Sequence, residues 1–506
     1  MSAPITILWL RRDLRLADHP ALIAAAAHAH ETHGTLLPIF IWEPGVFAGR
    51  RASANRTWFL RESLRELSRE LESRGSTLLE VQGPGSSALP ALVEHLTTSG
   101  TAANEIALFF TRDHTPYARA RDRAVAELLA PRGVSVHATR GFTVVEPDEL
   151  LTGGGTAYGV YTPYFRRWLE RVSLNNERPL AAPVTLPAPS SLKLPPALQP
   201  DHAAIERAAQ PTATVALLPV PGETAARAAA ERWITAARGN GANGYAARRN
   251  TLADEEGTSR LSAALHLGLL SPRELVSRLL PLPPEREGER SGERLWVSQI
   301  AWRDFYTQVL WHAPHAARSS WKPAYDAIEW DTREETFNAW RDGRTGYPIV
   351  DAAMRQLRET GFMHNRARMI TASFLTKDLL VDWRKGEAHF LEHLVDGDVA
   401  ANNGGWQWSA GSGTDAQPYF RIFNPVTQAG NFDPDGAYVR RWIPELAALK
   451  APAIHAPWAH DAALAAAGIT LGVHYPEPIV DHAVARVRTL EAYARAVEGL
   501  PAPRGE

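Results

Sequence analysis

Residues 396–415 read DGDVAANNGGWQWSAGSGTD, in a part of the chain that otherwise carries helical patterns. Asp396 and Asp398 stand two residues apart, as do Trp406 and Trp408, and on a helix such pairs point to nearly opposite sides. The adjacent amides supply donors and acceptors, and the adjacent glycines allow close backbone approach. A solvated loop does not need the tryptophans, and a packed core does not favour the acids. The stretch therefore predicts a surface that binds a polar, ring-shaped ligand. The alternative is a glycine-rich turn between helices whose tryptophans pack outward.

The composition limits the class of protein. With 506 residues the chain is too long for one ordinary core, and 45% hydrophobic and 22% charged residues are typical of a soluble globular protein. Cysteine is absent, which excludes disulfides, thiolate metal sites and a catalytic thiol, and suits the reducing cytoplasm that we expect as its location. We expect no bound metal and no membrane contact. A formal charge of −2 means that any nucleic-acid contact needs a local basic patch.

The N-terminal third alternates short apolar runs with amphipathic helical segments. The apolar runs, many of them rich in β-branched residues, cover residues 5–10, 35–42, 76–83, 105–113 and 134–141. Helical patterns fill residues 57–75 and 118–133 between them. Repeated βα units with apolar strands predict an open parallel, Rossmann-like α/β sheet domain over residues 1–175.

The composition changes after this domain. Residues 176–221 are rich in proline, alanine and serine, which predicts a long linker with at most one short helix. From residue 222 to 506 the strand pattern disappears, and helical segments divided by glycine and proline follow one another, at 223–238, 271–280, 295–313, 348–360 and 363–383. The second domain is therefore predicted to be all-helical, and the opening stretch belongs to it.

Residues 255–265, EEGTSRLSAAL, place Thr258, Ser259, Arg260 and Ser262 at the start of a predicted helix. Hydroxyls, a guanidinium and free backbone N–H groups at a helix N-terminus suit a phosphate or diphosphate. The alternative is an ordinary N-cap, in which a hydroxyl accepts from the first backbone N–H groups.

Residues 361–375, GFMHNRARMITASFL, place Asn365, Arg368 and Met369 on one helical face, with Arg366 beside them. An amide, a guanidinium and a flexible thioether on one face suit a flat, partly polar ligand. The alternative is a solvated helix edge on which the methionine fills a gap in the core.

These motifs resemble those of the photolyase/cryptochrome flavoproteins. The resemblance rests on residues 363–387, MHNRARMITASFLTKDLLVDWRKGE, and 394–425, LVDGDVAANNGGWQWSAGSGTDAQPYFRIFNP. WLRRDLRLADHPAL, YGVYTPYFRRWL, EEGTSRLS and GRTGYPIVDAAMRQL agree with it in the same order, so that it covers nearly the whole chain. Within the family the chain looks most like the microbial DNA photolyases that act on cyclobutane pyrimidine dimers.

The resemblance implies an FAD held in the helical domain. Its implied contacts are Tyr245, Thr258, Ser259, Arg260, Leu261, Ser262, Trp296, Arg303, Asn365, Arg368, Asp396, Gly397, Asp398 and Asn402. Arg368 would pair with Asp396, and Asn402 would face flavin N5, where an uncharged amide favours the fully reduced flavin. Trp406, Trp383 and Trp330 would relay an electron from the surface to the excited flavin.

The resemblance also implies a DNA-binding face. Its implied residues are Arg249, Gln299, Trp302, Asn365, Arg366, Met369, Trp408, Arg421 and Gln428. Trp302 and Trp408 would stack on a flipped-out dimer, and the arginines would neutralise phosphates. Gln299 departs from the glutamate usual in the cyclobutane-dimer enzymes, and six-four enzymes and many cryptochromes have glutamine there. HNRARM at 364–369 nevertheless favours the cyclobutane class.

The implied activity is light-driven repair of cyclobutane pyrimidine dimers by electron transfer from reduced FAD to the flipped-out lesion. A second, light-harvesting chromophore is expected in the α/β domain, with a reduced folate, a deazaflavin or another flavin as candidates. The expected partner is damaged DNA, and the expected state is a monomer. The alternatives are a cryptochrome-type photoreceptor, a photolyase acting on six-four lesions, and a nucleotide-binding protein without photochemistry.

Overall fold

The computed structural model describes residues 3–49, 51–174, 178–187, 192–236, 239–283, 291–415, 418 and 420–498. The chain divides into two compact units. The first comprises Met1–Pro211, Pro219–Asn243 and Ser259–Pro314, and the second comprises Thr212–Leu218, Gly244–Thr258 and His315–Glu506. These units follow proximity in space, whereas the domain limits after residues 175 and 221 follow composition and stay a prediction.

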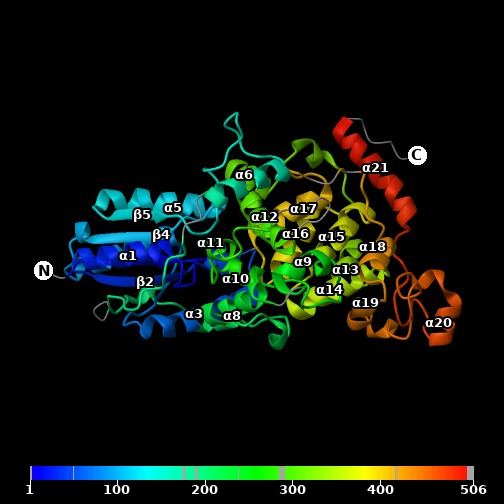
Figure 1. Cartoon of the computed structure of the whole chain (residues 1–506), viewed down its shortest axis with the longest axis horizontal. Coiled ribbons are helices and arrows are strands. Elements are labelled where there is room, and N and C mark those ends of the chain that lie inside the picture. Colours follow the sequence, from blue (N-terminus) through cyan, green and yellow to red (C-terminus); the bar gives the residue numbers. More distant parts are fainter. Residues whose placement is uncertain are drawn as a thin grey trace. The chain divides into compact units, whose positions relative to one another are not determined.

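The first unit contains a five-stranded, fully parallel sheet in the order β3-β2-β1-β4-β5 (Figure 1). Its strands are β1 (Ile5–Leu10), β2 (Thr35–Trp42), β3 (Leu79–Gln82), β4 (Ile106–Thr111) and β5 (Ser135–Thr139). Helices α1 (Pro20–Glu31), α3 (Ala54–Glu72), α4 (Gly85–Thr98) and α5 (Pro116–Leu129) alternate with them. The prediction of an open parallel α/β sheet is confirmed.

The apolar spacing of α4 explains how a helix covers this sheet. Leu89, Leu92, Val93 and Leu96 recur at helical spacing and join one buried cluster with side chains of β1, β2 and β4. Full burial of each such side chain stabilises the fold by about 1.5–3 kcal/mol.

The rest of the first unit is helical. It contains α2 (Pro44–Phe47), α6 (Tyr161–Leu174), α7 (His202–Ala208), α8 (Glu223–Ile234), α10 (Ser262–His266), α11 (Pro272–Ser277) and α12 (Gly292–His312). The 21-residue helix α12 contributes Trp296, Val297, Ile300 and Phe305 to the buried residues of this unit.

The second unit is built of helices. They are the C-terminal part of α9 (Gly241–Arg248), α13 (Glu334–Arg341), α14 (Pro348–Thr360), α15 (Asn365–Ser373), α16 (Trp383–His393), α17 (Val399–Ala410), α18 (Pro425–Phe432), α19 (Ala437–Trp442), α20 (Asp461–Ala467) and α21 (His482–Glu498). Among the described residues after 222 no β-strand forms, which confirms the prediction of a helical second part. Within the described part of the chain, no helix has the length and apolar character required to cross a bilayer.

The helix predicted over residues 363–383 is interrupted, so its continuous form is wrong. A π-helical turn at Phe374–Asp378 follows α15, and Leu380 adopts a positive φ of 54°. Asp382 then caps the new helix α16, because its carboxylate accepts from the Arg384 N–H at 2.9 Å. The break redirects the chain before Trp383.

The C-terminal helix α21 stabilises this break. His482 pairs with the buried Asp378 at 2.5 Å, and the Arg488 guanidinium donates to the Asp378 carbonyl at 2.6 Å. One end of α17 is held by the same helix, since the Tyr493 hydroxyl donates to the Ala410 carbonyl at 2.8 Å. Helix α21 thereby contacts both the break before Trp383 and the end of α17, the helix that carries Trp406.

Candidate functional site

The glycine- and tryptophan-rich stretch forms the helix α17, and the alternative of a turn is wrong. Asp398 is its N-cap, with the carboxylate accepting from the Ala401 N–H at 2.9 Å, and Gly411 ends it in the left-handed conformation. Gln407 anchors the helix, because its amide donates to the Ala316 carbonyl and accepts from the Trp321 N–H, at 2.9 and 2.8 Å. The paired acids lie just before the helix.

Trp406 points into the core of the second unit and is 2% exposed. Its ring meets Phe390 edge-on at 4.9 Å and lies 6.0 Å from Trp340. Gly386 on α16 permits this approach, because a Cβ there would overlap the indole ring carbons and come within 2.7 Å of Leu375. A glycine is therefore required where α16 meets α17.

The three tryptophans of the predicted relay share one hydrophobic cluster. Trp406 and Trp383 belong to its buried part, and Trp330 packs against it from a half-buried position. Trp330 also lies edge-on to Tyr493 at 6.2 Å. Among the described residues, neither Trp406 Nε1 nor Trp383 Nε1 has a hydrogen-bond acceptor. The unit thus concentrates large aromatic rings in one connected core.

Arg368 and Asp396 form the ion pair that the sequence predicts. Arg368 Nη2 lies 2.8 and 3.1 Å from the two Asp396 carboxylate oxygens, and Arg368 Nε donates to the Met363 carbonyl at 2.8 Å. The Asp396 side chain is only 4% exposed. Loss of the guanidinium would leave a buried carboxylate without its charged partner, which typically costs about 3–5 kcal/mol.

Asn402 is oriented by the helix next to it. Its amide Nδ2 donates to the Glu387 carbonyl at 3.0 Å, and a carbonyl can only accept, so this contact fixes which end of the amide is nitrogen. The Asn402 Oδ1 atom remains as an acceptor. The neighbouring Asn403 is buried, and within the described part of the chain its Nδ2 has no partner. The first turns of α17 thus offer one acceptor, Asn402 Oδ1, and one donor, Asn403 Nδ2.

Helix α15 brings together the predicted polar face. The Asn365 amide lies 3.9 Å from the Met369 sulfur, as the spacing predicts. The Arg366 guanidinium donates to Asn250 at 2.8 Å and lies 4.4 Å from the centre of the Phe432 ring. Burial and the nearby positive charge of Arg249 lower the pKa of Arg366. Two guanidiniums close to each other form a local site for anions.

The other predicted residues of the second unit differ in their exposure. Tyr245 is buried with the Arg249 guanidinium 5.0 Å from its ring centre, and burial raises its pKa. Arg421 is exposed, and Gln428 and Trp408 are half-buried. Gly397 lies between the two acids, before α17 begins.

The first unit carries the remaining predicted residues, four of them on α12. Trp302 stacks on Tyr161 at a centroid distance of 3.7 Å, so one face of the indole is covered within this unit. The Gln299 amide donates to the Leu295 carbonyl of its own helix at 3.2 Å. Trp296 lies 6.2 Å from Trp233. Arg303 donates to the Phe142 carbonyl at 2.7 Å and covers the ring of the same residue.

The segment from Thr258 to Ser262 was predicted at the start of a helix, but only its last residue, Ser262, lies in one. Helix α10 begins only at Ser262, after Arg260 with a positive φ of 51°, because that backbone conformation is incompatible with an α-helix. The N-cap alternative is also wrong, since Leu261 occupies the N-cap and makes no side-chain cap bond. The phosphate role of Thr258, Ser259 and their neighbours stays a prediction.

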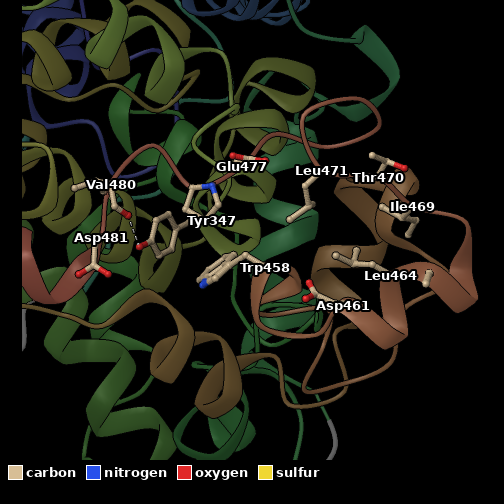
Figure 2. A pocket seen from close by; sticks show the side chains of 12 residues that line it. Tyr347, Trp458, Asp461, Leu464, Ile469, Thr470, Leu471, Glu477, Val480 and Asp481 are labelled. Atoms are coloured by element: carbon tan, nitrogen blue, oxygen red, sulfur yellow. Dashed lines mark hydrogen bonds between the residues drawn. The ribbon is translucent and has the colours of Figure 1, made fainter.

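A cavity of about 690 Å³ lies elsewhere in the second unit (Figure 2). Its walls combine aromatic rings, Tyr347 and Trp458, with the carboxylates of Asp461, Glu477 and Asp481. The Tyr347 hydroxyl donates to the Val480 carbonyl at 2.8 Å, and both residues line the cavity. None of the residues predicted for the flavin or the DNA lines it.

Sequence reasoning missed the residues that hold the site in place: Gly386, Gln407, Tyr161 and Phe142. Gln407 gave a signal, because it is a polar residue four positions after Asn403, and its amide donates to Asn403 Oδ1 at 3.0 Å. Gly386 is one of 36 glycines, and its role depends on a tryptophan twenty residues later.

Comparison with known proteins accounts for nearly the whole chain. Residues 6–188 match the family model described as DNA photolyase, and residues 296–495 match the FAD binding domain of DNA photolyase. The chain is 38% identical over 497 residues to the deoxyribodipyrimidine photo-lyase of Escherichia coli strain K12, covering 97% of this chain and 99% of that protein.

Solved structures agree with the sequence comparison. A bacterial class III photolyase from Agrobacterium tumefaciens superposes with a TM-score of 0.86 at 37% identity, covering 98% of each chain. The cryptochrome of Synechocystis superposes with a TM-score of 0.85 at 28% identity, covering 97% of this chain and 100% of that one.

Proposed function

Because the chain belongs to the DNA photolyase family, we propose that it repairs cyclobutane pyrimidine dimers in DNA with light and FAD. The single observation that carries this proposal is the similarity, across almost its full length, to proteins named deoxyribodipyrimidine photo-lyase. The chain also contains an FAD-binding domain of the DNA photolyase type. It is therefore a lyase and a flavoprotein of DNA repair.

The chemistry of several predicted residues fits a flavin. Arg368 balances the charge of Asp396, so that a carboxylate can stand beside a polar ring edge at little electrostatic cost. Asn402 presents its Oδ1 atom as an acceptor because Glu387 occupies the amide nitrogen. Tyr245 and the segment Thr258–Ser262 would contact the phosphates, with Trp296, Arg303 and Asn365 as further contacts. When bound, FAD supplies the light absorption and the transferable electron.

The protein's own groups prepare the electron transfer. Asn402 would accept a hydrogen bond from a reduced flavin without adding negative charge, as an aspartate there would. Trp406, Trp383 and Trp330 would carry an electron inward to recharge the flavin, since their rings share one cluster that reaches a half-buried position. The large indole rings suit such a relay because Trp406 packs against Phe390 and Trp340, and Trp330 against Tyr493.

We propose that the basic and aromatic residues bind the lesion. Arg249, Arg366 and Arg421 would neutralise DNA phosphates, which makes binding sensitive to salt. Trp302 and Trp408, both half-buried, would stack on bases that have lost their own stack. Asn365 and Met369 would face the lesion, Gln299 would contact it, and Gln428 would belong to the DNA-contacting rim.

The finer features are also proposals. A second chromophore in the α/β part, a reduced folate, a deazaflavin or another flavin, would broaden the absorption. We propose that damaged DNA is the substrate in the cytoplasm and that the protein acts as a monomer.

The test is illumination of the reduced protein with two DNA substrates, one carrying a cyclobutane thymine dimer and one a six-four lesion. We expect thymines to be restored only from the first substrate and only in light. Repair of the second substrate alone would assign the protein to six-four lesions. Bound flavin without repair of either would favour the photoreceptor alternative, which the likeness to the Synechocystis cryptochrome supports. A protein that cannot be loaded with flavin would refute both.

A further inference from the structure

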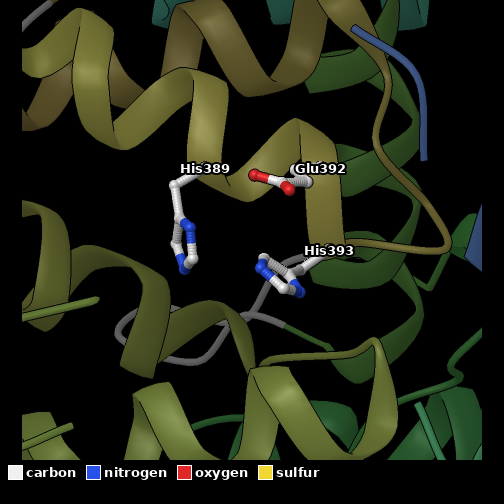
Figure 3. Close-up of side chains that lie close together, drawn as sticks. All are labelled: His389, Glu392 and His393. Atoms are coloured by element: carbon white, nitrogen blue, oxygen red, sulfur yellow. The ribbon is translucent and has the colours of Figure 1, made fainter. Parts of the chain in front are cut away.

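The C-terminal half of α16 carries three metal-ligand side chains that the flavin and DNA proposals do not use. His389, Glu392 and His393, in the sequence HFLEH, stand at positions i, i+3 and i+4 of one helix. This spacing places them on one face. One ligand atom from each lies within 4.8 Å of the others, and Figure 3 shows the two imidazoles on the same side of the helix.

His389 is the buried member of this cluster. It is 8% exposed, its ring lies edge-on to Trp340 at 5.6 Å, and the His393 ring is 4.4 Å away.

The surrounding charges select the class of metal. Two carboxylates, Glu392 and Asp342, and two guanidiniums, Arg341 and Arg358, surround the cluster. The Arg341 guanidinium pairs with the Asp342 carboxylate at 2.9 Å. The Arg358 guanidinium donates to the Asp342 carbonyl at 3.4 Å. These charges balance, so no net negative field attracts Ca²⁺ or Mg²⁺, which bind through oxygen atoms. Imidazole nitrogens prefer transition metals.

We propose that His389, His393 and Glu392 bind one divalent transition-metal ion of the Zn²⁺ class. Two histidines four residues apart on one helix face can chelate such an ion, and the exposed Glu392 completes a His₂Glu set from the solvent side. The fourth position would hold water. The ion would hold the C-terminal half of α16, the helix that begins at Trp383, in a fixed geometry.

The experiment uses the full-length, tag-free protein, loaded with flavin and freed of metal by a chelator. Zn²⁺ is titrated by calorimetry, and Co²⁺ is followed by its visible absorption. We expect one equivalent to bind and the unfolding midpoint to rise with Zn²⁺. His393→Gln should weaken binding by about tenfold or more, and Glu392→Gln should weaken it less.

The matched control is His202→Gln, which removes an exposed histidine from α7 in the first unit and should leave binding unchanged. Glu392→Gln alters only an exposed side chain, so it tests the site even where a histidine variant folds poorly. Absence of binding by the wild-type protein would overturn the proposal, as would binding of equal strength by the wild type, His393→Gln and Glu392→Gln.

Discussion

Gly386→Ala probes the contact on which the core of the second unit depends. The new Cβ would overlap the Trp406 ring and approach Leu375 Cδ2 to 2.7 Å. The indole cannot easily move, because Phe390 and Trp340 enclose it at 4.9 and 6.0 Å. Overpacking of this kind costs about 1–3 kcal/mol. For a unit of this size that corresponds to a decrease in the unfolding midpoint of about 2–12 °C.

The matched control is Gly430→Ala, also a glycine inside a helix of this unit, α18. A Cβ there meets nothing within 4 Å, so the better helix propensity of alanine should stabilise by up to about 1 kcal/mol. Thermal unfolding followed by circular dichroism compares both variants with the wild type, and the rate of flavin photoreduction reports on Trp406. If Gly386→Ala unfolds at the wild-type temperature or above, the described packing of α16 on α17 is incorrect.

Three further changes test separate parts of the molecule, two of them in the site and one, His19, at the N-cap of α1. Arg368→Met removes the partner of Asp396, and we expect about 3–5 kcal/mol of lost stability together with a lower flavin-to-protein ratio; an unchanged ratio would contradict the role of the pair. Burial lowers the pKa of His19 to about 4 from 6.5, so this group's contribution of about 3 kcal/mol is complete above pH 6.5 and lost as the pH falls toward 4. In His19→Asn the unfolding midpoint should depend less on pH between 6.5 and 4. An unaltered pH profile would refute the assignment of this pH dependence to His19. In Gln299→Glu the new carboxylate cannot donate to the Leu295 carbonyl, so we expect the side chain to turn away from the helix backbone. We expect this variant to repair more dimers per absorbed photon than the wild type. A lower repair yield would count against a lesion contact at this position.

The sheet was predictable because each strand is a local signal. The runs at residues 5–10 and 35–42 coincide with β1 and β2, since continuous apolar sequences of this length suit strands buried on both faces. The break before α16 was not predictable from periodicity. Residues 363–383 keep a helical apolar pattern, whereas the interruption depends on the Asp382 cap and on α21, whose His482 and Arg488 come from more than a hundred residues later.

The same distinction applies to the site. Asn365 and Met369 were predicted to meet because helical spacing alone determines that contact, and their 3.9 Å approach follows. The opening stretch suggested the pairing of Arg368 with Asp396 only through family resemblance. The supports at Gly386 and Gln407 depend on how helices pack, and no local pattern encodes a crossing point.

The indoles of Trp406 and Trp383 are a costly choice for packing alone. Both Nε1 groups are buried without an acceptor among the described residues, which typically costs about 1–3 kcal/mol for each donor. Phenylalanine would fill much of the same space without that donor, as Phe390 does in the same cluster. Local rules of stability are most often violated at functional sites. Two unsatisfied indoles in one core, with Trp330 packed against that core from a half-buried position, therefore support the electron relay that we propose.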